Sequence, residues 1–365
     1  MTAKPTILVA PLDWGLGHAT RCIPLIRQLL QQGCNVLLAA DGPQAVVLQE
    51  AFPALPMLQL QGYGVQYSRK AVMWKVLSQV PAIVRAISLE HQWLQTVVKK
   101  HKIDLVISDN RYGLWSPHCK SILITHQLAL PTPKGWGWTA GLLRKMLYKQ
   151  IEQFTECWVP DIADSHASLS AALGHPTILP KLPVHYMGWL TRFEPSTIAS
   201  PAFAHKLIII LSGPEPQRTL LEQLVLAQLP FVKDAVLVVR GLPGATHLPD
   251  VPAHVTVVNH LPGEALQKAM EQAEYVVARG GYSTLMDAFT LRKKCIFVPT
   301  PGQIEQEYLC QKLQEHQAAI CFSQAAFSLP EALLQAENFS FQLPSSTGAG
   351  GLANFVPTAL QRLLN

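Results

Sequence analysis

Short apolar runs alternate with amphipathic stretches along the whole chain. In the first half, this pattern predicts four strands, at residues 6–12, 35–40, 104–108 and 121–125. Between the first two lies a predicted helix, 19–32, which Gly33 should end and which should bury one side, made up of Cys22, Ile23, Ile26, Leu29 and Leu30. The second half shows five further predicted strands, at residues 206–211, 235–240, 255–258, 275–278 and 294–298. Strands separated by helices are typical of parallel α/β folds.

The length of the chain, 365 residues, exceeds what one typical hydrophobic core holds, so we expect two domains. Residues 180–205 are rich in proline and aromatic side chains and lack periodicity, which makes them the predicted hinge. The predicted organisation is an N-terminal domain over 1–190, a C-terminal domain over 191–351 and a last helix within 352–365.

The composition narrows the class of protein. It is 49% hydrophobic, yet no run approaches eighteen uninterrupted apolar residues, and the N-terminus lacks a signal-peptide layout. Seven cysteines are scattered without a CxxC pair, which indicates reduced, mostly buried thiols in a cytoplasmic protein. The net charge of +5 fits an anionic ligand or membrane surface, whereas basic runs and zinc-finger spacings that would indicate nucleic-acid binding are missing from the sequence.

A glycine pair, Gly280-Gly281, stands between the strand-like run 274–279 and the helix-like run 283–291. Glycines at a strand-to-helix turn let the backbone approach a ligand, and the N–H groups of the helix start carry a positive partial charge suited to a diphosphate. Further along, a turn leads into amide and carboxyl side chains suited to sugar hydroxyls: Gln303, Gln306 and Glu307. These three could instead form a plain polar helix start. The order of the two features indicates a sugar nucleotide.

The first strand-to-helix turn contains a carboxylate, two glycines and a histidine: Asp13, Gly15, Gly17 and His18. Gly15-x-Gly17, with Asp41 near the end of the second strand, admits a dinucleotide site, but Thr20 replaces the third glycine. His18 would open a helix at the carboxyl end of a strand, where doubly wound sheets bind ligands. A helix N-terminus lowers the pKa of a histidine and keeps its imidazole neutral. The alternative is an ordinary turn with an incidental histidine.

Two charged residues of the second half have competing interpretations. Gly213 and two prolines make 212–218 a rigid loop, from which Arg218 could reach a phosphate or simply face solvent. Asp287 lies one turn into the helix after the glycine pair, where its carboxylate could accept hydrogen bonds from both ribose hydroxyls. Because Thr284-x-x-Asp287 also matches a capping box, Asp287 could instead cap its own helix.

Three segments together carry a family resemblance: the Gly17-His18 turn, residues 279–287, and Gln306-Glu307-Tyr308. They resemble the GT-B glycosyltransferases of family 28, which include the N-acetylglucosaminyl transferase of the peptidoglycan lipid precursor and the galactolipid synthases. The resemblance implies an α/β GT-B architecture, with two Rossmann-like parallel-sheet domains facing a cleft. The N-terminal domain would bind the acceptor and the C-terminal domain the UDP-sugar, and the last helix would pack back on the N-terminal domain.

The resemblance also implies roles for individual residues. Asp287 matches the family's ribose-binding glutamate, Gln306 and Glu307 its sugar-contacting pair, and His18 its first-turn histidine. The predicted UDP-sugar site comprises Gly17, Gly213, Arg218, His260, Leu261, Arg279, Gly280, Gly281, Tyr282, Ser283, Thr284, Asp287, Gln303, Gln306 and Glu307, the main chain near His260 and Leu261 meeting the uracil.

Two features concern the acceptor. The first loop, 13–18, is not the glycine-rich run of the peptidoglycan enzyme, and 125–127 lacks that enzyme's glutamate, so we do not expect this chain to be that enzyme. Residues 134–149 interleave Trp136 and Trp138 with aliphatic residues and four cations, Lys134, Arg144, Lys145 and Lys149. This composition suits an interfacial segment on anionic lipid, enlarged by 68–87; the alternative is a core helix with a solvated basic face.

We therefore predict a metal-independent, inverting hexosyl- or N-acetylhexosaminyltransferase that uses a UDP-sugar, a lipid-linked hydroxyl acceptor and no further cofactor. The sequence lacks an Asp-x-Asp to hold a cation on the diphosphate, and the helix start at Gly280-Gly281 offers dipoles for that charge. The predicted general base is His18, with Asp13, Asp109 and His126 as alternatives. Three other functions stay open: a non-hydrolysing UDP-sugar epimerase, an NAD-dependent oxidoreductase, and a non-catalytic nucleotide-sugar-binding subunit. The predicted location is cytoplasmic, at the inner face of the membrane.

Overall fold

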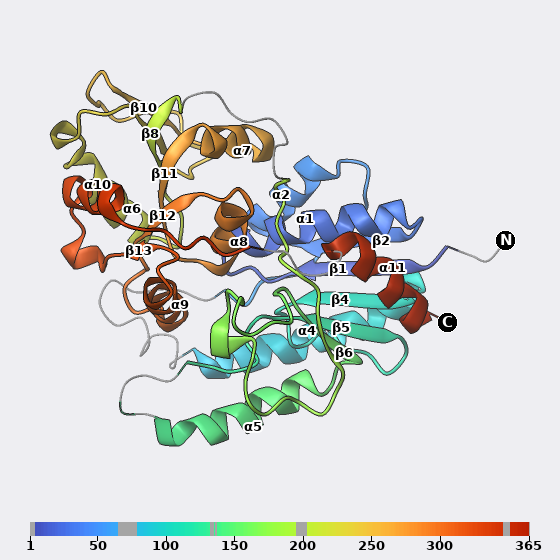
Figure 1. Cartoon of the computed structure of the whole chain (residues 1–365). Coiled ribbons are helices and arrows are strands. Elements are labelled where there is room, and N and C mark those ends of the chain that lie inside the picture. Colours follow the sequence, from blue (N-terminus) through green and yellow to red (C-terminus); the bar gives the residue numbers. More distant parts are fainter. Residues whose placement is uncertain are drawn as a thin grey trace. The chain divides into compact units, whose positions relative to one another are not determined.

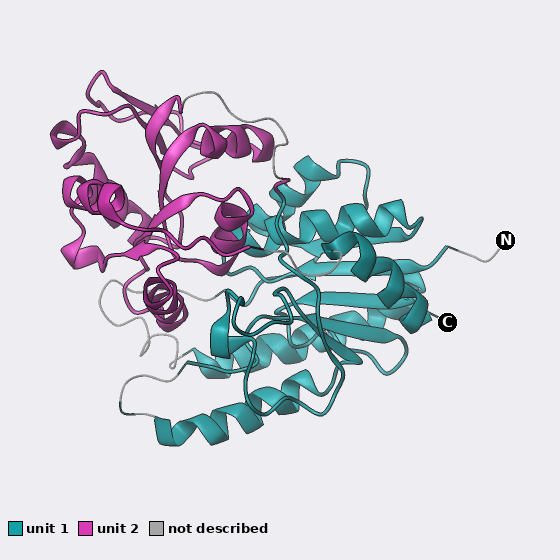
Figure 2. Cartoon of the chain, viewed as in Figure 1, with its two compact units in different colours: residues 1–66, 76–192, 346–365 teal, residues 67–75, 193–345 magenta. Residues whose placement is uncertain are grey.

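The computed structural model describes residues 4–64, 79–131, 135, 137–194, 203–345 and 351–364 (Figure 1). These residues form two compact units (Figure 2). Unit 1 contains the described residues up to Arg192 together with 351–364, and unit 2 contains the described residues from Phe193 to Ser345. Unit 1 thus includes both ends of the described chain.

Unit 1 is built on a parallel sheet whose described strands follow the order β3-β2-β1-β4-β5-β6-β7. The strands are β1 Thr6–Pro11, β2 Asn35–Ala40, β3 Met57–Gln59, β4 Leu105–Asp109, β5 Lys120–Ile124, β6 Glu156–Val159 and β7 Val184–Tyr186. Every residue of β4 is buried, as expected for a strand covered on both faces. The strand order reverses between β1 and β4, and ligands of such sheets bind at the carboxyl ends of the strands at this reversal.

Four helices connect described strands of unit 1: α1 Leu16–Gln31, α2 Gly42–Ala51, α4 Val80–His101 and α5 Ala140–Ile151. Helix α11 Gly351–Leu364 joins the unit after the last strand of unit 2, and short 3-10 turns lie at Gly137–Thr139 and Ala171–Leu173. Gly33 has a φ of 78°, a left-handed conformation that ends α1 at little cost. α11 packs against α1. Its Arg362 binds the buried Glu156 of β6 through two hydrogen bonds of 2.8 Å, and its Phe355 meets Trp158 edge to face.

Unit 2 is built on a second parallel sheet, with its described strands in the order β10-β9-β8-β11-β12-β13. They are β8 His205–Ile210, β9 Val236–Val239, β10 Val255–Val258, β11 Ala273–Ala278, β12 Lys294–Phe297 and β13 Ile320–Cys321. The helices are α6 Gln217–Leu226, α7 Gly263–Glu271, α8 Tyr282–Thr290, α9 Ile304–Glu315 and α10 Leu329–Asn338, with 3-10 turns at Leu229–Phe231 and Gln324–Ala326. In this sheet the strand order reverses between β8 and β11.

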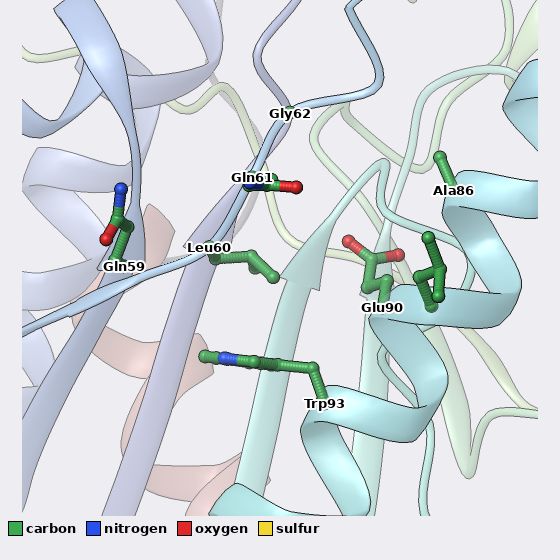
Figure 3. Close-up of a pocket in the computed structure, with 8 residues that line it drawn as sticks. Gln59, Leu60, Gln61, Gly62, Ala86, Glu90 and Trp93 are labelled. Atoms are coloured by element: carbon green, nitrogen blue, oxygen red, sulfur yellow. The ribbon is translucent and has the colours of Figure 1, made fainter.

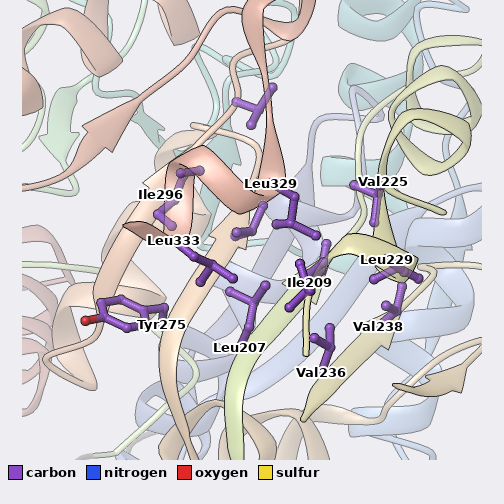
Figure 4. Close-up of a cluster of buried hydrophobic side chains, with 14 of the residues drawn as sticks. Leu207, Ile209, Val225, Leu229, Val236, Val238, Tyr275, Ile296, Leu329 and Leu333 are labelled. Atoms are coloured by element: carbon purple, nitrogen blue, oxygen red, sulfur yellow. The ribbon is translucent and has the colours of Figure 1, made fainter. Parts of the chain in front are cut away.

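The main apolar core of unit 2 lies against one face of its sheet (Figure 4). Alternate strand residues such as Leu207, Ile209 and Val238 point into it. Helices α6 and α10 cover them with Val225 and Leu333. The alternation fixes which residues of each strand face the helices and therefore fixes the register of the sheet.

All nine predicted strands are confirmed to within two residues at each end, and the predicted bounds 35–40 and 255–258 agree with the structure. Two predictions about α1 are wrong. The helix begins at Leu16 and not at residue 19, so His18 lies inside its first turn. Leu30, expected on the buried side, is 37% exposed. The short strands β3, β6, β7 and β13 were not predicted.

The seven cysteines are all free thiols, five of them buried, as predicted. No helix within the described residues is long and apolar enough to cross a membrane. Trp136, Lys134 and residues 68–78, which the sequence assigned to a membrane-facing surface, lie outside the described residues.

Candidate functional site

His18 and Asp109 meet at the point where the strand order of unit 1 reverses. His18 lies in the first turn of α1, directly after β1, and Asp109 is the last residue of β4. Pro11 of β1 is paired with Asp109 in the sheet, so the start of α1 lies beside the end of β4. Nδ1 of His18 is 3.2 Å from Oδ2 of Asp109.

Arg21 completes this cluster, and sequence reasoning missed it. Its Nε donates to Oδ2 of Asp109 at 2.8 Å, and its Nη2 donates to Oδ1 of the same carboxylate. Arg21 and Asp109 are 2% and 1% exposed, so this is a buried ion pair. A signal was available: Arg21 stands three residues after His18, a spacing that places two side chains on one helix face.

The tautomer of His18 depends on which neighbour its Nδ1 contacts. Nη2 of Arg21 lies 3.0 Å from the same Nδ1 that faces Asp109. If Nδ1 carries the proton it donates to Asp109, and Nε2 is then free to accept a proton. If Nδ1 is bare it accepts from Arg21, and Nε2 then carries the proton and is no base. Within the described residues, Nε2 has no hydrogen-bond partner.

Burial and charge keep His18 neutral and Asp109 ionised. Burial, followed by the positive charge of Arg21, lowers the pKa of His18 below 6.5, while Asp109 acts in the opposite direction. His126 also lowers the pKa of His18, which places it near the imidazole. Burial opposes ionisation of Asp109, but Arg21 and His18 outweigh it and hold the pKa of that carboxyl well below its usual range. Asp109 is therefore a poor base, contrary to one of the sequence-based alternatives.

Asp13, another alternative base, holds a loop. Its carboxylate accepts hydrogen bonds from the backbone N–H groups of Tyr63 at 3.0 Å and Gly64 at 3.3 Å. A side chain at Gly62 would collide with it, since a Cβ there would lie 2.1 Å from Oδ2. Asp13 thus ties the segment after β3 to the β1–α1 turn, a structural role that the sequence did not indicate.

A cavity of about 420 Å³ lies beside this loop (Figure 3). Leu60 and Gln61 line one side, and Glu90 and Trp93 of α4 line the other. The carboxylate of Glu90 is buried and already has protein partners. It binds Arg111 and accepts hydrogen bonds from Oη of Tyr63 at 2.9 Å and from the backbone N–H of residue 113 at 2.9 Å. The side-chain amides of Gln59 and Gln61 have no such partners among the described residues. The cavity therefore offers two side-chain amides and the indole of Trp93 to a ligand.

In unit 2, Arg279 lies between β11 and the glycine pair, at the reversal of the second sheet. Its side chain is 1% exposed and, among the described residues, donates to the backbone carbonyls of Val298 at 3.1 Å, Pro299 at 3.2 Å and Gln217 at 2.7 Å. Burial lowers the pKa of Arg279 to about 10, which leaves it charged at neutral pH. No carboxylate of the described residues pairs with it.

Two buried polar atoms at this place have no partner within the described residues. They are Nε of Arg279 and Oγ1 of Thr300. Thr300 Oγ1 also lies close to Gly213, since a Cβ on that glycine would be 3.7 Å away. Buried polar atoms are nearly always hydrogen-bonded, and an unpartnered pair is typical of a place that a water or ligand occupies.

Gly280 and Gly281 have different surroundings, so glycine is required at these two positions to different degrees. A Cβ on Gly280 would lie 2.5 Å from Sγ of Cys310, so this glycine is required by the close packing of α9. A Cβ on Gly281 would meet nothing nearer than 3.9 Å, where Nε2 of Gln306 lies. Gly281 precedes α8, which starts without a side-chain cap. Packing against Cys310 thus accounts for Gly280 without a ligand, and a ligand role for either glycine stays a prediction.

Asp287 does not cap α8. The helix begins at Tyr282 with Gly281 at the N-cap, which places Thr284 inside the helix and rules out the capping box. Asp287 lies one turn after Ser283 and Thr284 and therefore on their face of the helix. Those two residues are partly exposed, whereas Asp287 is 9% exposed. Tyr282, another predicted ligand contact, has a buried side chain, so only its backbone is available.

The amides and carboxylate after β12 shape their own loop. Oε1 of Gln306 accepts from the backbone of Thr300 at 2.8 Å, and its Nε2 donates to Gln303. Glu307 accepts from the backbone of Gly302 at 2.8 Å and is exposed. His260 and Leu261, predicted to meet the base, follow β10 in the loop before α7, and they are exposed and partly exposed.

Arg218 is neither a solvated turn residue nor a free phosphate ligand. It is buried and donates to Glu215 at 2.6 Å, to Glu222 at 3.2 Å and to Thr219 at 2.6 Å. Glu222 also binds Arg240. The guanidinium of Arg218 therefore holds the loop after β8 against α6.

Comparison with known proteins agrees with this arrangement. Residues 256–362, which include Arg279, the glycine pair and Asp287, match the sequence profile of the glycosyltransferase family 28 C-terminal domain. No curated protein sequence matches the chain at a significant level.

Several solved structures are similar over the whole chain. The kitacinnamycin glycosyltransferase is 15% identical over 99% of this chain and 100% of its own, with a TM-score of 0.69. The glycosyltransferase SnogD from Streptomyces nogalater is 15% identical over 99% and 100%, with a TM-score of 0.61. The spinosyn rhamnosyltransferase SpnG, in complex with thymidine diphosphate, is 15% identical over 99% of each chain, with a TM-score of 0.63.

At this identity the similarity establishes the fold, and the predicted α/β GT-B architecture is confirmed. Likeness to the peptidoglycan and galactolipid enzymes in particular stays a prediction. The chain thus has the GT-B fold of glycosyltransferases, and its residues 256–362 match the family 28 C-terminal domain.

Proposed function

We propose that this protein is an inverting glycosyltransferase that moves a hexosyl or N-acetylhexosaminyl group from a UDP-sugar to a hydroxyl acceptor. The observation that carries the proposal is the buried charge of Arg279, which no described carboxylate balances, immediately before the uncapped start of α8. A buried charge without a counter-charge is costly, and a bound anion relieves that cost. A similar structure holds thymidine diphosphate, which supports a nucleoside diphosphate as this anion.

The chemistry that fits unit 1 is proton removal. In a direct displacement, the acceptor oxygen forms a bond to the anomeric carbon while the bond from that carbon to the diphosphate oxygen breaks. The diphosphate leaves with the electron pair, and inversion follows from attack on the opposite face. Nε2 of His18 would take the acceptor proton, with Nδ1–H donating to Asp109.

The leaving diphosphate would be stabilised by Arg279 and the N–H groups at the start of α8. Because these groups already supply positive charge, we propose that transfer needs no divalent cation. Turnover that survives excess EDTA would support this part of the proposal, and turnover restored only by added Mg²⁺ or Mn²⁺ would contradict it.

Incubation with a panel of UDP-sugars and a lipid extract, followed by mass spectrometry, tests the function as a whole. A new product heavier by one hexosyl or N-acetylhexosaminyl unit is the expected result, with UDP released in equal amount. Conversion of a UDP-sugar to its epimer without any acceptor would instead show the epimerase that the sequence left open.

Asp287 provides the sharpest test of the donor site. If its carboxylate binds both ribose hydroxyls, Asp287→Ala should weaken UDP binding by about 1.5–3 kcal/mol, the range for hydrogen bonds to a charged group. Thymidine diphosphate lacks the 2′-hydroxyl, so its affinity should fall by less. Calorimetric titration of both nucleotides measures the difference. Asp234→Ala, which removes an exposed carboxylate of unit 2, is the control. Equal effects on the two nucleotides in a folded variant would remove Asp287 from the ribose site.

A further inference from the structure

Helix α5 has two opposite faces. Leu147, Tyr148 and Ile151 pack into a buried cluster of unit 1. On the other side, Leu142 and Met146 are 62% and 59% exposed, and Trp138 in the preceding 3-10 turn is 80% exposed. Leu142 and Met146 are four residues apart and therefore lie on one face of α5, and Trp138 stands in the turn that leads into the helix. We call Trp138, Leu142 and Met146 the outer stripe.

Cations border the outer stripe. Lys145 and Lys149 are exposed, and at about 100° per residue they lie on the same outward half of the helix as Leu142 and Met146. Arg144 adds a third positive charge, and the sequence of α5, AGLLRKMLYKQI, contains no carboxylate. The helix therefore combines large exposed apolar side chains with charge of one sign.

This combination selects among the surfaces that could cover the stripe. A second copy of the chain, pairing through the same face, would bring like charges together, which costs binding energy. An anionic bilayer suits all three features at once. Apolar side chains enter the boundary between headgroups and acyl chains, tryptophan prefers that boundary, and lysines reach out to lipid phosphates.

We propose that the outer stripe of α5, with Lys145 and Lys149, docks the protein on the surface of an anionic lipid bilayer. This inference goes beyond the proposed reaction and does not depend on it, because it concerns binding and is tested without turnover. The sequence allowed either a core helix or a membrane-facing segment here. In this proposal α5 is both: one face packs in the core of unit 1 and the other binds the membrane surface.

Vesicle sedimentation with the full-length protein tests the proposal. Vesicles of phosphatidylcholine alone are compared with vesicles containing phosphatidylglycerol, at low and high salt. The bound fraction should rise with phosphatidylglycerol and fall with salt, because attraction between exposed charges and the membrane is screened. Lys145→Gln with Lys149→Gln should reduce the partition coefficient at least about tenfold at low salt, since each cation near an anionic surface contributes about fivefold. Leu142→Gln with Met146→Gln should reduce it several-fold at either salt concentration.

Matched controls separate this face from general charge and hydrophobicity. Lys99→Gln with Lys100→Gln removes two exposed cations from the end of α4, and Val46→Gln with Leu334→Gln removes two exposed apolar side chains from other helices. Both control variants should bind vesicles as the wild type does. The proposal fails if the α5 variants bind as well as the controls. It fails equally if the wild type ignores anionic vesicles but forms a dimer, seen by sedimentation velocity, that Leu142→Gln with Met146→Gln abolishes.

Discussion

The carboxylate of Asp109 accepts hydrogen bonds from the guanidinium of Arg21 and lies 3.2 Å from Nδ1 of His18, and the thiol of Cys22 approaches it at 3.7 Å. Each of these contacts favours the ionised form, so Asp109 holds a fixed negative charge and does not exchange protons near neutral pH. The residue best placed to exchange a proton is His18, whose side chain is 16% exposed. At the scale of residues, the sequence pointed to both side chains as alternative bases, and the contacts of Asp109 now separate their expected roles.

His18→Gln tests the base directly. Glutamine still forms hydrogen bonds but cannot take a proton, so turnover should fall by about 10²–10⁴-fold, the usual contribution of a positioned base. The affinity for UDP should stay nearly constant, because the imidazole would serve the acceptor. Steady-state kinetics and UDP titration measure the two quantities. Near wild-type turnover of the folded glutamine variant would show that His18 only positions a ligand.

Arg21 should set the acid limit of activity. The neutral form of His18 is the base, so kcat/KM should fall as the pH drops through its pKa, which lies below 6.5. Arg21→Gln removes a positive charge that lowers this pKa, so the acid limb should move to higher pH. The same change leaves Asp109 buried with less compensation and should cost about 3–5 kcal/mol of stability.

Arg21→Lys keeps the charge and serves as the matched variant, and its acid limb should stay near that of the wild type. The pH dependence of kcat/KM in the two variants, with thermal melting as a check of folding, decides the point. An acid limb that does not move in folded Arg21→Gln would show that Arg21 has no influence on the base.

At the scale of elements, the start of α8 combines two constraints in neighbouring residues. Gly280 is fixed by the packing of α9, whereas Gly281 leaves open space at the N-cap. From sequence alone the pair read as one ligand-binding feature, because a glycine that avoids a collision and a glycine that admits a ligand look identical. Only the position of Cys310, thirty residues later in the chain, separates them.

Alanine substitutions of the two glycines should therefore affect different quantities: stability for Gly280 and UDP affinity for Gly281. Gly280→Ala places a methyl group against Sγ of Cys310 and should lower stability by about 1–3 kcal/mol, the usual cost of overpacking. Adding Cys310→Ala should recover part of this loss, since the two sites are in contact. Gly281→Ala should leave stability within about 0.5 kcal/mol, because its φ of −76° suits alanine, but it should weaken UDP binding.

Urea denaturation and UDP titration of the three variants provide the measurements. Equal stability losses for Gly280→Ala and Gly281→Ala would show that the packing difference does not exist in solution. Unchanged UDP affinity in Gly281→Ala would argue against a diphosphate at this helix start.

At the scale of the whole molecule, the alternation of apolar runs with amphipathic stretches predicted the two parallel sheets. A strand of a parallel sheet is buried on both faces, so it forms an uninterrupted apolar run in the sequence. Contacts between distant segments were not predictable in this way. Asp13 holding residues 63–64, Arg218 closing on Glu222 and Arg362 reaching Glu156 depend on tertiary proximity and not on local pattern. Sequence reasoning named His18 and Asp109, which lie at or shortly after the end of a strand, and missed Arg21, which lies one turn further into α1.

Removal of residues 346–365 should destabilise unit 1 selectively. Helix α11 buries Val356, Leu360 and Leu363, each contributing about 1.5–3 kcal/mol, and its Arg362 compensates the buried Glu156. The sum is comparable to the stability of a typical domain. Hydrogen exchange read by mass spectrometry should show lost protection in α1 and β6 but unchanged protection in β8 and β11. Equal protection of both units in the truncated chain would contradict this expectation.

The return of α11 to unit 1 also sets an order of events during synthesis. Residues 203–345 form their sheet from one continuous stretch, so unit 2 has all of its parts as soon as that stretch has left the ribosome. Unit 1 needs residues from both ends of the described chain, and its last contacts join positions as far apart as Glu156 and Arg362. Closing so long a loop is slow compared with forming local contacts. We therefore expect the side of α1 that α11 covers to stay exposed to solvent in the nascent chain until unit 2 has been synthesised.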